Sequence, residues 1–182
     1  MTAPIATYRT RPTGIWSPHH EILDANGRIG VLQAERNRWS LTTRATWRPE
    51  KGEVLTFRRD PGLLRSQFSV WTDGREWLGS SLRSRFFGRE IALSTPSKSL
   101  RMLPVPGFQR GWRLHAPKTG ELARITPDGL GKASTLQVFR RVELELVLFA
   151  YFVGALVYAE SYWPGPAIVD DLESLPTAPS KA

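Results

Sequence analysis

The sequence contains one long apolar run near its C-terminus, and this run restricts the possible folds more than any other feature. Residues 146–159 read LVLFAYFVGALVYA, with no charged residue and with two tyrosine hydroxyls as the only strong hydrogen-bonding groups. Glu143 and Glu145 precede the run, Glu160 follows it, and Pro164 comes shortly afterwards. A helix over this segment is apolar on every face, so it has to be surrounded either by protein or by lipid.

The length of the run favours burial in protein. At 1.5 Å per residue a 14-residue helix is roughly 21 Å long, whereas the hydrocarbon core of a bilayer is roughly 30 Å thick. We therefore expect a helix near residues 143–162 in the core of the protein. The alternative is a single membrane span or C-terminal anchor, in which Arg140 and Arg141 would mark the cytoplasmic side.

Residues 20–142 show a different pattern, in which short apolar stretches alternate with turn sequences. Asn26-Gly27 lies between the apolar stretches 20–23 and 29–33, which is a strong hairpin signal because both turn residues tolerate positive φ. Trp39 to Thr43 alternate with a period of two, as in a half-buried strand. Further strands are predicted at Val54–Arg58, Leu63–Trp71, Glu76–Arg85, Trp112–His115, Glu121–Ile125 and Thr135–Val142, with breaks around Gly88, Pro96 and Pro104–Gly107. Turns recur about every 10–14 residues, which is typical of an all-β barrel or sandwich.

The two ends of the chain differ from this pattern. Residues 1–18 contain three prolines and no periodicity, which predicts a loose N-terminal arm. Residues 164–182 contain four prolines and several acids, which predicts a disordered acidic, Pro-rich tail. One β-barrel domain is therefore expected over residues 19–163, since a chain of 182 residues is long enough for one substantial core.

A weak internal repeat relates three of the predicted hairpins. Gly27, Gly74 and Gly120 lie 47 and 46 residues apart, each within a similar turn sequence. This period is near that of a propeller blade, but three copies cannot close a propeller of four or more blades. The repeat therefore favours a hairpin unit used several times in one barrel.

The order of these elements resembles that of the tubby C-terminal-like superfamily, which includes tubby, the phospholipid scramblases and the LURP-one-related proteins. The resemblance covers roughly residues 15–163, through the hairpins around Asp24-x-x-Gly27-x-x-Gly30 and Asp73-Gly74-x-x-x-x-Gly79 and through Val138-Phe139-Arg140-Arg141, which leads into the apolar run. It implies a mainly β fold, a single closed antiparallel barrel of twelve strands around a C-terminal hydrophobic helix. The chain lacks the cysteine cluster, the long Pro-rich arm and the acidic Ca²⁺ loop of a scramblase, so the resemblance implies a fold more than an activity.

The charge is distributed unevenly along the chain. The total formal charge is +8, with a balance of +13 over residues 1–141 and −5 over residues 142–182. A basic body favours a polyanionic partner, either an anionic membrane surface or nucleic acid. Most of the basic residues before position 142 are Arg, and a GC-rich genome produces the same bias without any ligand.

Three arginines, Arg83, Arg85 and Arg89, form the candidate anion-binding site. Arg83 and Arg85 fall on one face of a predicted strand, and Arg89 follows closely. A guanidinium group binds phosphate through two parallel hydrogen bonds, so this cluster is suited to a lipid headgroup or a nucleic-acid backbone. The alternative is an ordinary solvated strand face.

Tryptophan and arginine are neighbours at three further places. Arg38-Trp39, Trp47-Arg48 and Trp112-Arg113 interleave aromatic and basic residues, as a platform for single-stranded nucleic acid requires. Core tryptophans beside outward arginines on a strand produce the same alternation. A nucleic-acid-binding barrel is therefore an alternative function.

No catalytic or metal-binding arrangement is found in the sequence. Gly129-Leu130-Gly131-Lys132 departs from a phosphate-binding loop, because Thr126 and Ala133 replace the required Gly and Ser or Thr. His19 and His20 are adjacent, so on a strand they point to opposite faces and make a poor metal pair. The chain has no cysteine, which excludes disulfides and thiol chemistry. The sequence therefore favours a protein without catalytic activity, metal or cofactor.

Together these features favour a non-enzymatic binding or scaffold protein at the inner membrane surface, where it recognises anionic lipid headgroups. The N-terminal sequence has no apolar h-region of a signal peptide, so a cytoplasmic protein that is peripheral to the membrane is expected. The alternatives are a C-terminally anchored single-span protein and the nucleic-acid-binding barrel. A protein partner is a further candidate for the basic surface.

Overall fold

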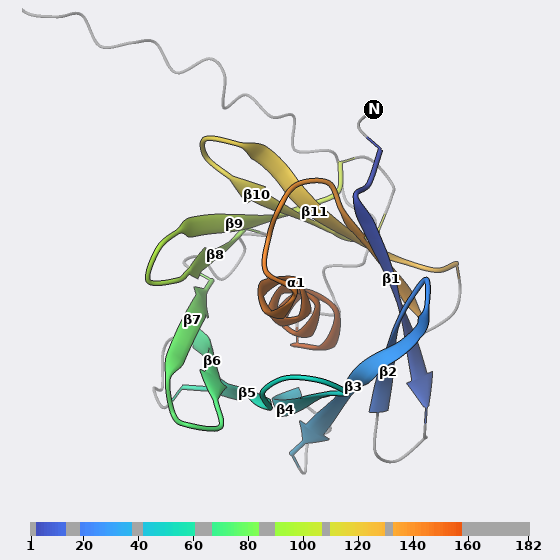
Figure 1. Cartoon of the computed structure of the whole chain (residues 1–182). Helices are drawn as coiled ribbons and strands as arrows, with labels where there is room; N and C mark the ends of the chain where they lie inside the picture. The colour runs from blue at the N-terminus through green and yellow to red at the C-terminus, as the bar shows by residue number, and fades with distance from the viewer. Residues whose placement is uncertain are drawn as a thin grey trace, which may run out of the picture.

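The chain forms a closed antiparallel β-barrel around a helix, as the apolar run predicts. The computed structural model describes residues 3–13, 19–37, 42–60, 67–83, 90–106, 110–129 and 133–157. Within these residues twelve strands follow one another around the barrel in chain order, and β1 closes it by pairing with both β2 and β12 (Figure 1). The fold-class prediction is therefore confirmed.

The strands are β1 (Ala6–Thr13), β2 (His19–Asp24), β3 (Gly27–Arg36), β4 (Thr42–Pro49), β5 (Leu55–Arg59), β6 (Gln67–Thr72), β7 (Trp77–Leu82), β8 (Ile91–Ser94), β9 (Ser99–Pro104), β10 (Trp112–Ala116), β11 (Gly120–Pro127) and β12 (Ser134–Val138). The helical segment consists of α1 (Leu144–Tyr151) and a π-helical continuation, η1 (Phe152–Val157).

The strands form because their residues alternate between the inside and the outside of the wall. In β12, Ser134, Leu136 and Val138 are buried, whereas Thr135 and Gln137 between them are half-buried. Successive side chains on a strand point to opposite faces, so each strand contributes one face to the core and one to the surface.

The helix fills the inside of the barrel. Figure 1 shows α1 end-on at the centre of the ring of strands. Every residue from Leu146 to Val153 is at most 7% exposed. The rings of Phe149 and Phe152 lie 5.6 and 5.5 Å from that of Phe57 on β5. Because strands surround the helix on all sides, protein covers its apolar surface completely and shields it from water.

The helix prediction of residues 143–162 agrees with the observed span of 144–157, and residues 158–162 lie outside the described residues. Over the part of the chain that the structure describes, no helix is both long and apolar enough to cross a membrane.

One backbone contact fixes the helix against β10. The indole Nε1–H of Trp112 donates a hydrogen bond to the carbonyl oxygen of Gly154, with 3.0 Å between the atoms. A Cβ atom at position 154 would lie 2.6 Å from Trp112 Cδ1 and 2.9 Å from Met102 Cε, which is too close for any side chain. Glycine is therefore required here because the indole ring packs directly on the helix backbone.

A second contact is a polar cluster inside the otherwise apolar core. The hydroxyl of Tyr151 lies 3.0 Å from Nδ1 of His20 on β2, and the polar side chains of Thr10 and Ser134 interact with it. His20 is 5% exposed and Tyr151 is 1% exposed. Burial, followed by the nearby charges of Arg36 and His19, lowers the pKa of His20 to about 4. Burial raises the pKa of Tyr151 to about 12, so both groups stay neutral near pH 7.

The three repeated hairpins are found at β2–β3, β6–β7 and β10–β11, each four strands after the last. The turn chemistry differs from the prediction at the β2–β3 hairpin. Gly27 takes a φ of 129°, but Asn26 before it does not have positive φ; instead its backbone N–H bonds the Asp24 carboxylate at 2.7 Å. In the β6–β7 turn it is Arg75, not Gly74, that has positive φ, at 66°.

The predicted loose arm over residues 1–18 is wrong for β1. Residues 6–13 pair with β12 through Ala6↔Val138 and with β2 through Pro12↔His20. The sequence did not predict this strand because its inward residues, Tyr8 and Thr10 among them, include no strongly apolar run. Pro12 is tolerated near the end of the strand, although proline usually interrupts a ladder. Residues 1–2 and 14–18 lie outside the described residues.

The break in strand structure that was predicted around Pro96 is shorter than expected. Pro96 lies in the tight turn between β8 and β9, where the backbone N–H of Thr95 bonds the carbonyl of Lys98 at 2.9 Å. The flanking strands bury Leu93 and Leu100 opposite each other. The last predicted strand, residues 135–142, ends at Val138, and residues 139–143 instead lead into the helix.

The two ends of the barrel can be distinguished by its connections. Because neighbouring strands are antiparallel, the turns β2–β3, β4–β5, β6–β7, β8–β9 and β10–β11 all lie at one end. Residues 139–143 enter the barrel from the same end, which we call the α1 end.

Replacing Gly154 should destabilise the barrel. Gly154→Ala gains up to about 1 kcal/mol of helix propensity, but the clash with the buried Trp112 ring should cost about 1–3 kcal/mol in the free energy of unfolding. Gly154→Leu should cost more. Urea denaturation measures both variants. Gly74→Ala is the control, since a Cβ there comes no closer than 3.6 Å to its neighbours. Unchanged stability of Gly154→Leu would contradict the packing described.

Acid should weaken the fold through His20. The unfolded chain takes up this proton at about pH 6.5, whereas the folded chain takes it up only near pH 4. The contribution of neutral His20 is therefore complete above pH 6.5 and is lost as the pH falls towards 4, by about 3 kcal/mol in total.

Denaturation curves of the parent and of His20→Phe between pH 7 and 4 test this expectation. The variant should lose this part of the acid dependence. Tyr151→Phe serves as the control, because it removes the hydroxyl but keeps the buried imidazole, and so should retain the pH dependence. Equal pH dependence in the parent and in His20→Phe would show that another group is responsible.

Candidate functional site

The interior of the barrel is occupied by α1 and η1, so a candidate site has to lie on the outer wall or at an end. Among the described residues, no three His, Asp or Glu side chains are placed to hold a metal ion. The outer wall, by contrast, carries a large number of arginines. These are Arg9, Arg11, Arg28, Arg36, Arg44, Arg48, Arg58, Arg101, Arg113 and Arg124, and they outnumber the strand acids Glu21, Asp24, Glu35 and Glu121.

Some of these arginines are paired with acids. Arg28 lies 3.0 Å from Glu50, and Arg124 lies 2.7 Å from Glu121. The hydrogen bonds to Glu121 raise the pKa of Arg124 further. Ion pairs at the surface of a protein contribute little to stability, typically about 0–1 kcal/mol, but they do neutralise the charge locally. A polyanion would therefore interact with the parts of the wall where arginines lack an acidic partner.

Strand register places one such group on β4 to β7. Arg44 on β4 lies directly opposite Arg58 on β5. In the neighbouring row of outward-facing residues, Thr56 on β5 pairs with Trp71 on β6, and Trp71 pairs with Trp77 on β7. Like charges directly opposite each other on a sheet repel. Arg44 has an acid nearby, Glu35 at 3.9 Å, whereas Arg58 has no ion-pair partner within the part of the chain that the structure describes. A bound anion would relieve this repulsion.

Arg58 and Trp71 form a stacked pair at the centre of this region. The guanidinium carbon of Arg58 lies 4.7 Å from the centroid of the Trp71 ring. The indole orientation is fixed by a hydrogen bond from Trp71 Nε1 to Ser69 Oγ at 2.7 Å, and the Ser69 hydroxyl in turn bonds Asp60. The charged group and the aromatic ring are therefore held together before any ligand binds.

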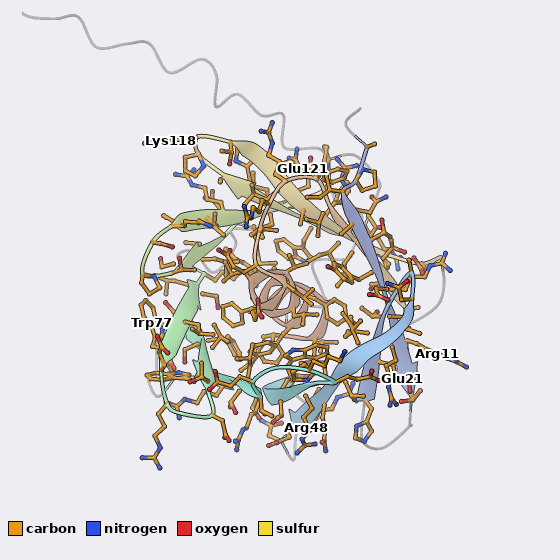
Figure 2. The ribbon with its side chains drawn as sticks, viewed as in Figure 1. Arg11, Glu21, Arg48, Trp77, Lys118 and Glu121 are labelled. Carbon is orange, nitrogen blue, oxygen red and sulfur yellow. The ribbon has the colours of Figure 1, made fainter. Side chains whose placement is uncertain are left out.

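Trp77 extends the aromatic part of the surface. It is paired in register with Trp71 across a β-bulge and is 36% exposed, which is unusual for so large an apolar side chain. In Figure 2, Trp77 and Arg48 are labelled on the outside of the wall. We refer to Arg44, Arg48, Arg58, Trp71 and Trp77 as the Arg/Trp face.

The candidate site predicted from the sequence lies mostly outside the described residues. Arg83 directly follows β7 and is half-buried, but Arg85 and Arg89 are not among the residues that the structure describes. The structure therefore does not test whether the three arginines come together.

Of the two interpretations of the Trp–Arg neighbours, the tryptophan platform is wrong at two of its three places, and core tryptophans beside outward arginines are confirmed there. Trp47 and Trp112 are 3% and 1% exposed, because both point into the core beside outward Arg48 and Arg113. The third, Trp39, lies outside the described residues. The tryptophans on the outer wall are instead the half-buried Trp71 and the exposed Trp77, which the sequence alone did not single out. A sequence signal for Trp71 was available in its spacing of two residues from Ser69 and four from Gln67, which places all three on the same face of a strand.

Comparison with known proteins supports the fold. No protein-family model matches the sequence, and neither does any curated protein. The crystal structure of a protein from Arabidopsis thaliana is similar, with a TM-score of 0.50 and 16% sequence identity, over 81% of this chain and 91% of that one. At this level of identity the similarity shows that the two chains share a mainly β barrel fold.

Proposed function

We propose that this chain is a non-enzymatic binding protein that attaches to anionic membrane surfaces through the Arg/Trp face. The observation that carries the proposal is the guanidinium of Arg58 stacked on Trp71, with Arg44 and the exposed Trp77 beside them. Arginine binds phosphate oxygens through parallel hydrogen bonds, and tryptophan is favoured at the headgroup level of a bilayer. Both components of an interfacial surface are thus found together.

The arrangement favours a membrane over single-stranded nucleic acid. Stacking of successive bases needs several exposed aromatic rings along a basic groove. Trp47 and Trp112 are buried, and one face of Trp71 is covered by Arg58. A nucleic-acid-binding barrel is accordingly the second candidate, and the experiment below includes it.

The location and family are part of the proposal. The order of elements resembles the tubby C-terminal-like superfamily, and a closed barrel around an apolar helix is the fold this resemblance implies. We place the protein in the cytoplasm, peripherally at the inner membrane surface, and regard Arg83, Arg85 and Arg89 as a further anion-binding cluster. A C-terminal membrane anchor is the alternative mode of attachment.

Removing the two opposed arginines should weaken membrane binding. Each basic residue near an anionic bilayer contributes about 1 kcal/mol, so Arg44→Gln with Arg58→Gln should reduce affinity for phosphatidylserine-containing liposomes by at most roughly thirtyfold. Trp77→Ala should also reduce binding, and pure phosphatidylcholine liposomes should bind weakly. Co-sedimentation at physiological ionic strength measures these affinities.

Arg101→Gln with Arg124→Gln provides the matched control, since it removes the same charge from β9 and β11, far from β4 and β5 around the barrel. If both double variants lose affinity equally, binding depends on net charge alone and the Arg/Trp face is not the site. Binding of a single-stranded oligonucleotide at the same salt concentration, without liposome binding, would favour the nucleic-acid alternative.

A further inference from the structure

A cleft opens beside the first turn of α1, at the α1 end of the barrel and apart from the Arg/Trp face. Its volume is about 430 Å³. Its floor is apolar and consists of Leu55, Val70, Leu78 and Leu146, which come from β5, β6, β7 and α1. A volume in the range of about 300–1,000 Å³ with a mostly apolar lining is typical of sites for small organic ligands.

The rim of this cleft is acidic, although the chain as a whole carries a charge of +8. Glu53, Glu76, Glu143 and Glu145 all line it. Glu143 is paired with the ammonium group of Lys98, at 3.0 Å. The other three carboxylates have no ion-pair partner among the described residues.

We propose that this cleft binds a small organic ammonium ion with an apolar body. The apolar floor would hold the hydrocarbon part, and Glu53 and Glu145 would hold the charged head at the rim. The pair of Lys98 and Glu143 already shows an alkylammonium group bound by a carboxylate at this edge, with 3.0 and 3.4 Å to the two oxygens.

The charges at the cleft select a cation over an anion. The N-terminus of α1 contributes roughly half a positive charge, which by itself would favour an anion. Four carboxylates against one Lys98 ammonium outweigh this contribution. The pKa of Glu143 is lowered by its own backbone N–H and by Lys98, which keeps that carboxylate charged.

Comparison with a neighbouring cleft shows which of the two is better suited to an ammonium ion. It has a volume of about 450 Å³ and shares Glu53 and Glu145, but Arg28 and Lys51 also line it. Asp24 and Glu50 line it as well, so its lining carries four carboxylates and two cations, whereas the first cleft is lined by four carboxylates and no cation. The cleft over Leu55 and Val70 is therefore the one suited to an amine.

Titration of the full-length protein with hexylamine, followed by amide chemical shifts, tests the proposal. A ligand of this size should bind with a Kd of about 1 mM, and shifts should concentrate around Thr72, Leu78 and Leu146. Hexanoate, which has the same hydrocarbon chain and the opposite charge, should bind at least tenfold more weakly. From butylamine to hexylamine the affinity should rise about fourfold per methylene, because the floor is apolar.

Glu53→Gln with Glu145→Gln should weaken hexylamine binding about tenfold, at roughly threefold per exposed carboxylate. Glu35→Gln with Glu121→Gln is the matched control, since it makes the same change in net charge on the outer wall and should bind hexylamine as the parent does. Equal binding of hexanoate, unchanged affinity in the Glu53 and Glu145 variant, or no shifts at all would each overturn the proposal. Liposome binding is independent of these outcomes.

Discussion

The rest of the structure depends on one constraint, which is that a helix apolar on every face has to be enclosed. A single sheet covers one face of a helix, but a closed barrel covers all of them, and here twelve strands surround Leu146 to Val153. At about 25 cal/mol per Å² of apolar surface, burial of these eight residues is a large share of the driving force for folding. Closure through β1 is part of the same requirement, because an open seam would expose the helix.

Two polar contacts give this apolar packing a defined arrangement. The Trp112 indole bonds the carbonyl of Gly154, and the Tyr151 hydroxyl meets His20. Apolar packing is not directional, whereas buried hydrogen bonds are costly to leave unmade, so these contacts set the depth and rotation of the helix. With its interior occupied, the barrel offers its outer wall and its ends to partners, and that is where the Arg/Trp face and the acidic cleft lie.

The sequence predicted the features that depend on local patterns. The all-apolar run indicated the enclosed helix, and turn residues indicated most hairpins, since both signals are contained in a few adjacent residues. β1 was missed because Tyr8 and Thr10 face inward without forming an apolar stretch. The contact of Arg58 with Trp71 could not be foreseen, because it depends on the register between β5 and β6. The cleft combines residues more than 90 positions apart, from Glu53 to Leu146.

Amide hydrogen exchange of the helix tests the central claim most directly. If the barrel encloses the helix, the backbone amides of residues 148–153 can exchange only when the whole barrel unfolds. Their opening free energy should then equal the global free energy of unfolding measured by denaturant, and it should match that of the most protected strand amides. Exchange of these helix amides through a smaller opening free energy, while the strands remain protected, would show that the barrel stands without its helix and would contradict the account.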